Sequence, residues 1–151
     1  MDIRVDDLRG PEIVAFVEEH LRDMHSYSPA HSCHVLDLDG LRRPEVTFWS
    51  AWDGATLLGC GALKELDPTH GEVKSMRTAA AARGRGVGSA MLRHILAEAA
   101  ARGYTRVSLE TGASVLRAPA RGLYEKFGFV RCGPFAEYAE DPNNAYYTKA
   151  L

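Results

Sequence analysis

Hydrophobic positions change their period along the chain, and each change predicts a different element. A short strand is expected at Ile3–Val5, and Pro11 then begins a segment whose apolar residues recur at helical spacing. The apolar residues of that segment are Ile13, Val14, Val17 and Leu21. The stretch from His25 to Pro44 is polar and irregular, which favours a lid or a segment on the substrate side.

Two runs rich in aromatic and β-branched residues follow and predict a β-hairpin. Val46–Trp52 and Thr56–Leu63 are separated by Asp53-Gly54, a strong turn signal. The two strands are expected to be antiparallel, because a short turn can join only antiparallel neighbours. A third strand is expected near Glu72–Thr78.

The period changes again at Val87, where a helix begins that Gly103 ends. Its apolar face consists of Val87, Met91, Leu92, Ile95, Leu96 and Ala99. The remaining segments read as strand, helix, strand and strand: Tyr104–Glu110, Pro119–Phe127, Phe129–Cys132 and Ala145–Leu151. The strand–helix–strand order from Glu72 to Glu110 predicts a right-handed crossover between parallel neighbours. We therefore expect an α+β fold, with helices flanking both faces of a mixed sheet.

Length and charge narrow the class of protein. The chain has 151 residues, enough for one domain spanning 1–151 with its own core, and 46% of them are hydrophobic. Lysine plus arginine (18) nearly balances aspartate plus glutamate (20), so neither nucleic acid nor a membrane surface is expected as a partner. The acidic start MDIRVDD and the lack of a run of about 18 apolar residues favour a cytoplasmic protein.

Cysteine and histidine spacings give no indication of a metal site. The cysteines are Cys33, Cys60 and Cys132. They lie far apart, form no CxxC pair and are interpreted as buried free thiols. Three histidines lie closer together but match no ligand spacing: His25, His31 and His34. No metal is therefore expected.

The most informative segment is the glycine-rich loop Arg83-Gly84-Arg85-Gly86-Val87-Gly88, between a predicted strand and the strongest predicted helix. Glycines allow close approach, and the unpaired N–H groups of a first helical turn attract an anion. Two arginines favour phosphate or pyrophosphate over a lone carboxylate. A P-loop would need Gly-Lys-Ser/Thr, and a dinucleotide fingerprint would need glycine where Ser89 stands. The alternative is a tight turn whose arginines lie in solvent.

Other segments extend the pattern around this loop. GEVKSMRTAAAA stands upstream, AMLRHILAEAAARGYTRVSLET stands downstream, and residues 120–129 read ARGLYEKFGF. Together with RGRGVG they resemble the GNAT superfamily of acyl-CoA-dependent N-acyltransferases, with its RxxGxG loop and its A-x-x-L-Y-x-x-x-G-F signature. GEVKSM, LETG and LYEKFGF also resemble a small bacterial subgroup. The resemblance covers residues 71–130 and implies a GNAT-like fold, in which two parallel strands splay apart around acetyl-CoA.

The resemblance implies where acetyl-CoA lies. Met76 and Thr78 match the positions whose backbone pairs with the pantetheine arm, although Thr78 can equally be a half-exposed strand threonine. The pyrophosphate cradle maps onto Arg83, Gly84, Arg85, Gly86, Val87, Gly88 and Ser89. Arg117 stands where many members have an asparagine that bonds the cofactor arm, and its guanidinium can still donate to carbonyl or phosphate groups.

The resemblance also implies catalytic roles. Tyr124 matches the family tyrosine that lies beside the thioester sulfur and protonates the departing thiolate, while amphipathic packing is the alternative. An amine with a pKa of about 10.4 must lose a proton before it attacks. Glu72 is the first candidate for the base and Glu110 the rival, and either can instead be an exposed strand-end charge. Lys74 shares a strand face with Glu72 and would lower its pKa or pair with it.

The expected function is an acetyl-CoA-dependent N-acetyltransferase, which acetylates a primary amine of a small molecule or peptide by direct attack in a ternary complex. His34 and Tyr138 are candidates for the acceptor pocket. Small members of the family often form homodimers, so a homodimer is included among the expectations. Two other classes stay open: a non-catalytic acyl-CoA-binding sensor with the same cleft, and a phosphometabolite-binding enzyme unrelated to acyl transfer.

Overall fold

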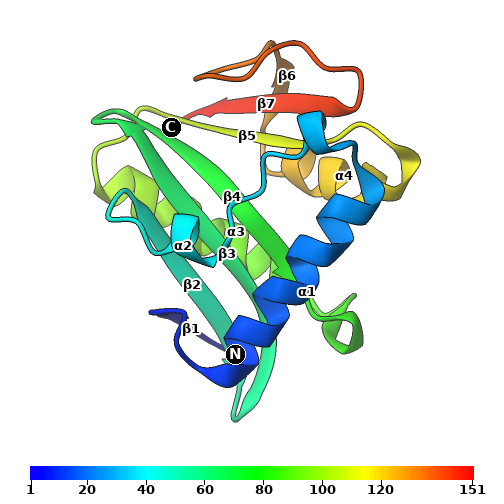
Figure 1. Cartoon of the computed structure of the whole chain (residues 1–151). Helices are drawn as coiled ribbons and strands as arrows, with labels where there is room; N and C mark the ends of the chain where they lie inside the picture. Colours follow the sequence, from blue (N-terminus) through cyan, green and yellow to red (C-terminus); the bar gives the residue numbers. More distant parts are fainter.

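The computed structural model describes every residue from Met1 to Leu151 (Figure 1). Its strands are β1 Asp2–Val5, β2 Val46–Asp53, β3 Thr56–Asp67, β4 His70–Thr78, β5 Arg106–Gly112, β6 Val130–Cys132 and β7 Asn144–Ala150. Its helices are α1 Pro11–Tyr27, α2 Leu38–Leu41, α3 Val87–Ala101 and α4 Ala118–Lys126. Short 3₁₀ turns lie between them: η1 Ala30–Ser32, η2 Ala80–Ala82 and η3 Val115–Arg117.

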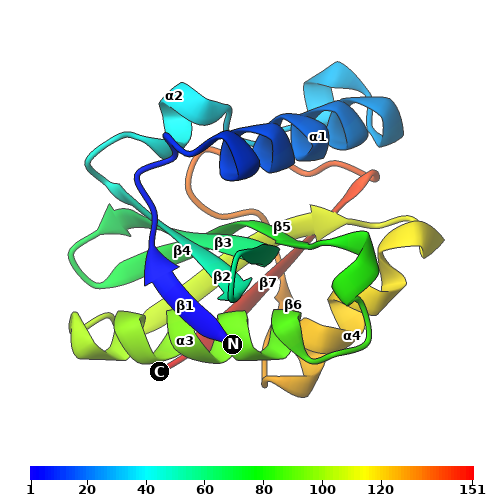
Figure 2. The ribbon, with the colours of Figure 1, turned by 90° about the horizontal axis from the view of Figure 1, so that it is seen from below.

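All strands join one seven-stranded sheet in the order β1-β2-β3-β4-β5-β7-β6. Helices α1 and α2 cover one face of the sheet, and α3 and α4 cover the other (Figure 2). Each face has its own hydrophobic core: Met91, Leu92 and Ile95 of α3 belong to the larger one, whereas Ile13 and Val17 of α1 belong to the smaller. The predicted α+β fold, with helices on both faces of a mixed sheet, is confirmed.

Strands β4 and β5 are the parallel pair, and they part halfway along their length. Residues His70–Val73 pair with Arg106–Leu109, yet β4 continues to Thr78 and β5 to Gly112 without further pairing between them. Beyond Val73, the edge of β4 that faces β5 therefore keeps backbone N–H and C=O groups that no strand satisfies. This is the splay that the family resemblance implies.

A β-bulge sits where the two strands part. Ser75 and Met76 together face Gly61 of β3, and the register between β3 and β4 shifts there. Ser75 has a φ of 55°, in the left-handed region that residues other than glycine rarely adopt. Gly61 leaves room for the crowded strand, because a Cβ atom there would lie 2.9 Å from Met76 Sδ of β4. The bulge increases the local twist, which turns β4 away from β5.

The largest differences from the predicted element boundaries lie at β3 and β5. Strand β3 runs to Asp67 rather than Leu63, because its polar end pairs with the start of β4 and Glu65 accepts a 2.7 Å hydrogen bond from the Tyr104 hydroxyl. Strand β5 lies two residues later than predicted at both ends. Tyr104 instead packs in the core before the strand begins, where its ring covers Gly71.

The predictions of an irregular segment and of buried thiols are each only partly confirmed. The stretch from His25 to Pro44 contains η1 and α2, and the Asp37 side chain caps α2 by accepting a 2.8 Å hydrogen bond from Gly40 N. All three cysteines are free, but only Cys60 is buried. Cys33 and Cys132 are half-buried, because one follows η1 and the other ends the edge strand β6.

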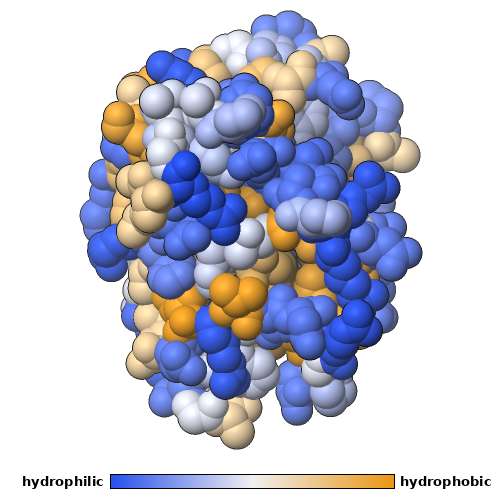
Figure 3. Space-filling view, turned by 90° about the vertical axis from the view of Figure 1, so that its left-hand side faces the viewer, coloured by the Kyte–Doolittle hydropathy of each residue, from blue (hydrophilic) through white to orange (hydrophobic).

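One face of the molecule shows how apolar side chains are spread over the surface. On the face shown in Figure 3, hydrophobic side chains form small separate groups among hydrophilic ones. No helix combines the length and the apolar character needed to cross a membrane. The homodimer stays a prediction.

The close approach of β3 and β4 generates a stability prediction. A Cβ atom at Gly59 would lie 2.7 Å from the backbone oxygen of Arg77, so the strands would have to shift. We expect Gly59→Ala to lower the free energy of unfolding by about 1–3 kcal/mol, the usual cost of overpacking. Urea denaturation measures this change.

Gly122→Ala is the matched control, because Gly122 lies within α4 and a Cβ atom there meets nothing within 4 Å. Alanine should raise the free energy of unfolding by about 0.5–1 kcal/mol through its better helix propensity. Equal stability of wild type and Gly59→Ala would contradict the tight strand packing.

Candidate active site

A cavity of about 330 Å³ lies where β4 and β5 part. Its walls come from α1, the segment 28–35, β4, β5, α4 with the turn before it, and residues 142–144 at the start of β7. Six predicted site residues line it: His34, Glu72, Met76, Glu110, Arg117 and Tyr124. The fold thus brings together side chains that lie up to 90 positions apart in the sequence, from 34 to 124.

Glu72 is the most deeply buried charge in this cavity. Its side chain is 1% exposed, and Lys74 Nζ lies 3.2 Å from Glu72 Oε2. The Tyr138 hydroxyl donates a 2.6 Å hydrogen bond to the same oxygen and accepts one of 2.9 Å from Lys74. The predicted pairing of Glu72 with Lys74 is present, and the alternative of an exposed strand-end charge is wrong for Glu72.

Tyr138 lies behind this ion pair rather than on the cavity wall. It is absent from the residues that line the cavity, so a direct contact with an acceptor stays a prediction. Burial, together with the adjacent Glu72 carboxylate, raises the pKa of the Tyr138 hydroxyl. Tyr138 therefore remains a hydrogen-bond donor at neutral pH and helps Lys74 to satisfy a carboxylate that is costly to bury.

Glu110 forms the second carboxylate of the site, and its side chain is 11% exposed. His34 Nδ1 lies 2.9 Å from Oε1 and 2.7 Å from Oε2 of Glu110, and Asn144 Nδ2 donates to Oε2 over 3.2 Å. Burial raises the pKa of Glu110, although the hydrogen bond from His34 opposes this. The exposed-charge alternative is therefore wrong for Glu110 as well.

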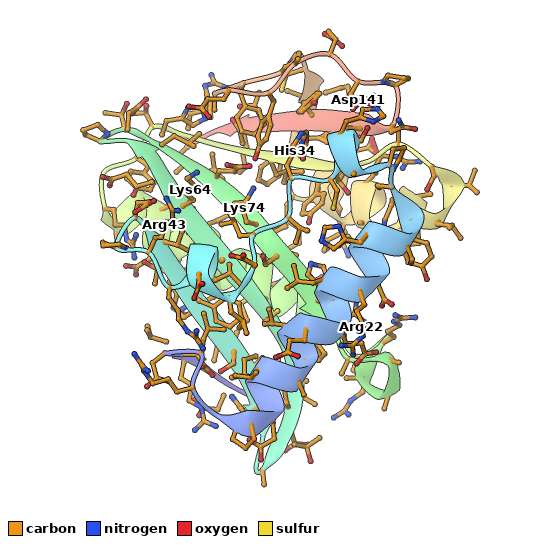
Figure 4. The ribbon with its side chains drawn as sticks, in the orientation of Figure 1. Arg22, His34, Arg43, Lys64, Lys74 and Asp141 are labelled. Carbon is orange, nitrogen blue, oxygen red and sulfur yellow. The ribbon has the colours of Figure 1, made fainter.

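The two carboxylate groups belong to one polar network. The imidazole of His34 packs on the Tyr138 ring with 4.9 Å between the ring centroids. His34 enters from the segment after η1 and Lys74 from β4, and both reach the same region (Figure 4). The network therefore joins β4, β5 and two loops through side chains alone.

Sequence reasoning missed the side chains that hold the two loops together. The Ser32 hydroxyl donates to Asp141 Oδ2, and Asn144 Nδ2 donates to the Ser32 carbonyl over 3.0 Å. Asp141 lies beside η1 in Figure 4. These partners are separated by 109 and 112 positions, so no spacing pattern could have identified them.

Tyr124 lies on α4 with 7% of its surface exposed, and it lines the cavity. Burial raises the pKa of Tyr124 to about 12, and no hydrogen bond from a protein group perturbs it. The phenol therefore stays protonated at neutral pH and can donate to an atom inside the cavity. Its ring packs edge-on against Phe129, which fixes its orientation.

Arg117 also lines the cavity, at the start of α4. Its guanidinium lies over the Tyr27 ring at 5.3 Å and donates to the sulfur of Met24 over 3.4 Å. Burial lowers the pKa of Arg117. The cation is thus held by α1 and forms no ion pair with a carboxylate, which leaves it able to donate to a ligand.

The glycine-rich loop ends in an open helix N-terminus. Gly84 and Gly86 have φ values of 77° and 79°, and Gly86 caps α3 without any side-chain hydrogen bond to the first turn. A Cβ atom at Gly88 would lie 3.7 Å from Thr78 Oγ1, so the loop adjoins the end of β4. Arg85 is exposed, 3.6 Å from Asp53 Oδ2. The geometry suits an anion at this corner.

A mixed sheet whose parallel strands part beside an open helix N-terminus is the architecture of acyl-CoA N-acyltransferases. The chain belongs to the acetyltransferase (GNAT) family, whose model matches residues 13–129. It is therefore an acetyl-CoA-dependent N-acetyltransferase, as the resemblance predicts, and a phosphometabolite enzyme of another family is set aside. No group of three histidine, cysteine, aspartate or glutamate side chains is arranged to hold a metal ion.

Known proteins are similar to this chain over nearly its whole length. The chain is 56% identical over 151 residues to the uncharacterized N-acetyltransferase YsnE of Bacillus subtilis, which covers 100% of both chains. It is 48% identical over 149 residues to the uncharacterized N-acetyltransferase YedL of Escherichia coli, covering 99% of this chain and 94% of that one. The crystal structure of aminoglycoside 6'-N-acetyltransferase complexed with coenzyme A has the same fold, with a TM-score of 0.75 at 18% identity, covering 99% of this chain and 97% of that one.

Buried His20 on the cavity wall generates a pH prediction. Burial, with help from the adjacent Arg77 cation, lowers the pKa of His20 from 6.5 to about 4. Between these values the unfolded chain binds a proton that the folded protein does not, so the free energy of unfolding falls as pH decreases. We expect His20 to contribute about 3 kcal/mol to that fall.

His20→Gln should flatten this dependence, because glutamine cannot take the proton. Urea titrations across the same pH window measure it. His25→Gln, at an exposed position of the same helix, is the control and should keep the wild-type slope. An unchanged slope in His20→Gln would show that another group titrates.

Proposed function

We propose that this protein, as one domain spanning residues 1–151, transfers the acetyl group of acetyl-CoA to a primary amine of a small molecule or peptide. The transfer proceeds by direct attack in a ternary complex. The observation that carries this proposal is the convergence of a protonated Tyr124, Glu72 and Glu110 on one cavity beside an open helix N-terminus. Acetyl-CoA supplies the activated acyl group.

The residues around the cavity fit acetyl-CoA by their chemistry. First-turn N–H groups of Val87, Gly88 and Ser89, with the guanidinium groups of Arg83 and Arg85, would hold the diphosphate. The pantetheine arm would pair with the free edge of β4 from Met76 to Thr78, because β5 leaves that edge beyond Val73. A backbone N–H of the same edge would polarise the acetyl carbonyl.

Different side chains of the site would remove the proton of the amine and protonate the departing thiolate. The amine must lose a proton before its lone pair can attack, and the polar network around Glu72 and Glu110 is the region that can take it. Tyr124 would donate to the departing thiolate, since burial keeps its phenol protonated. Arg117 would donate to the arm of the cofactor or to the acceptor. No covalent enzyme intermediate is needed.

Thiol release across a panel of amines tests the proposed function. Acetyl-CoA is mixed with amino acids, polyamines, aminoglycosides or peptides with free N-termini, and the liberated thiol is measured. We expect at least one class to raise release well above hydrolysis. Tight binding of coenzyme A with no response to any amine would overturn the proposal in favour of a non-catalytic sensor.

The loop assignment predicts that Gly86→Leu weakens coenzyme A binding. A side chain at Gly86 would occupy the space now open beside the first-turn N–H groups. Loss of a charge-assisted hydrogen bond is worth about 1.5–3 kcal/mol, so the Kd should rise about tenfold or more. Calorimetry with coenzyme A and with pantetheine, which lacks the diphosphate, separates the two ends of the cofactor.

Gly54→Leu controls for backbone strain. Gly54 also has a positive φ, of 58°, and nothing lies near its missing Cβ, but it belongs to the β2–β3 turn. Its substitution should leave coenzyme A affinity unchanged. If Gly86→Leu also weakened the binding of pantetheine, its effect would not be confined to the site that holds the diphosphate.

The acid assignment predicts that Tyr124→Phe lowers kcat by about 100-fold, the low end of general-acid contributions, with little change in the Kd for coenzyme A. Steady-state kinetics and calorimetry measure the two quantities. Tyr104→Phe is the matched control, because it removes another buried tyrosine hydroxyl that bonds Glu65 outside the cavity. Full activity in Tyr124→Phe would remove the proposed acid.

A further inference from the structure

The imidazole of His34 is held by one nitrogen and open at the other. Nδ1 lies within hydrogen-bond distance of both oxygens of Glu110, at 2.9 and 2.7 Å. An ionised carboxylate only accepts, so Nδ1 carries the hydrogen and a neutral ring keeps its lone pair on Nε2. The side chain of His34 is 30% exposed and lines the cavity. Nε2 is therefore a free acceptor at the wall of the site.

Neither carboxylate is as accessible from the cavity as His34, whose side chain is 30% exposed. Glu72 is 1% exposed, and its Oε2 already accepts hydrogen bonds from Lys74 and Tyr138. An incoming ammonium would have to displace the Lys74 cation to reach it. Glu110 uses Oε1 and Oε2 for His34, and Oε2 also for Asn144. Both carboxylates are thus engaged with protein groups.

We infer that Nε2 of His34 takes the proton from the amine acceptor, and that Glu110 is the positioning residue that fixes the tautomer and orientation of the ring. This inference rests on the proposed function and names the base within it. The arrangement follows the logic by which a buried carboxylate orients a histidine in other enzymes, here without a protein nucleophile.

The proton balance is complete without any further group. The ammonium R–NH₃⁺ gives one proton to Nε2, and the lone pair of R–NH₂ forms the C–N bond at the thioester carbonyl carbon. The C–S bond breaks, the new amide nitrogen loses a second proton, and the thiolate gains one. The imidazolium then releases its proton to solvent. One ammonium and one thioester thus yield one amide, one thiol and one proton.

The charges around His34 favour this step. The groups that face it, directly or through Glu110 and Tyr138, are Glu110, Tyr138, Lys74, Glu72 and Tyr146. Lys74 and Glu72 form an ion pair with each other, and both tyrosines are neutral at pH 7 because burial raises their pKa values. The remaining charge is that of Glu110, which stabilises the imidazolium while it exists.

The variants are compared on an amine that the wild-type enzyme acetylates. If wild type acetylates no amine, the proposed function fails before the inference about His34 is tested. His34→Asn keeps an N–H donor for Glu110 but has no atom in place of Nε2. We expect kcat/KM to fall about 100-fold or more, and its pH profile to lose the acidic limb. The affinity for coenzyme A should be unchanged. Added imidazole should restore part of the rate to His34→Ala.

Glu110→Gln and Glu72→Gln separate positioning from base chemistry. Both variants should be slower than wild type yet keep the acidic limb, because Nε2 is still present. Nitrogen NMR of the free protein should find the proton of the His34 ring on Nδ1, and Glu110→Gln should weaken that preference. Wild-type rates in His34→Asn would overturn the inference. So would a pH profile that loses its acidic limb only in Glu110→Gln or Glu72→Gln, or a His34 ring that carries its proton on Nε2.

Discussion

The structure depends on the separation of β4 from β5 after Val73 and Leu109. Two parallel strands that stay paired would satisfy each other's backbone groups and leave no cavity. Here the bulge at Ser75 turns β4 away, and Gly61 gives the crowded strand room on the opposite side. The free strand edge and the cavity both follow from this one local irregularity. A residue in an uncommon conformation is thus maintained by the surrounding core.

Burial of charge shapes the chemistry of the cavity. Glu72 and Lys74 are nearly inaccessible, and such an ion pair gains little stability over apolar side chains. Their presence is better explained by the electrostatics of the site, because the pair neutralises itself and leaves Glu110 as the charge beside His34. The network also holds Tyr138 against both His34 and Glu72. Its members come from β4, β5 and two loops, so the site forms only when the whole fold does.

Local sequence patterns predicted most of the fold, and six of the predicted site residues, most of them singled out by the family resemblance, line the cavity. The apolar periods of α1 and α3, the Asp53-Gly54 turn and the glycine-rich loop depend on neighbours in sequence, and each had its expected element. The bulge at Ser75 had no such signal, because it depends on Gly61 and on the departure of β5. The extension of β3 was missed for a related reason: a long-range hydrogen bond from Tyr104 supports its polar end.

The loop that follows η1 and the loop before β7 are joined by Ser32, Asp141 and Asn144, not by a strand ladder. One side of the cavity is therefore lined by loops that side-chain contacts hold together, and the other by strands and helices. Substitutions in these loops can reshape the first side without unpairing a strand or disturbing the turn into α3.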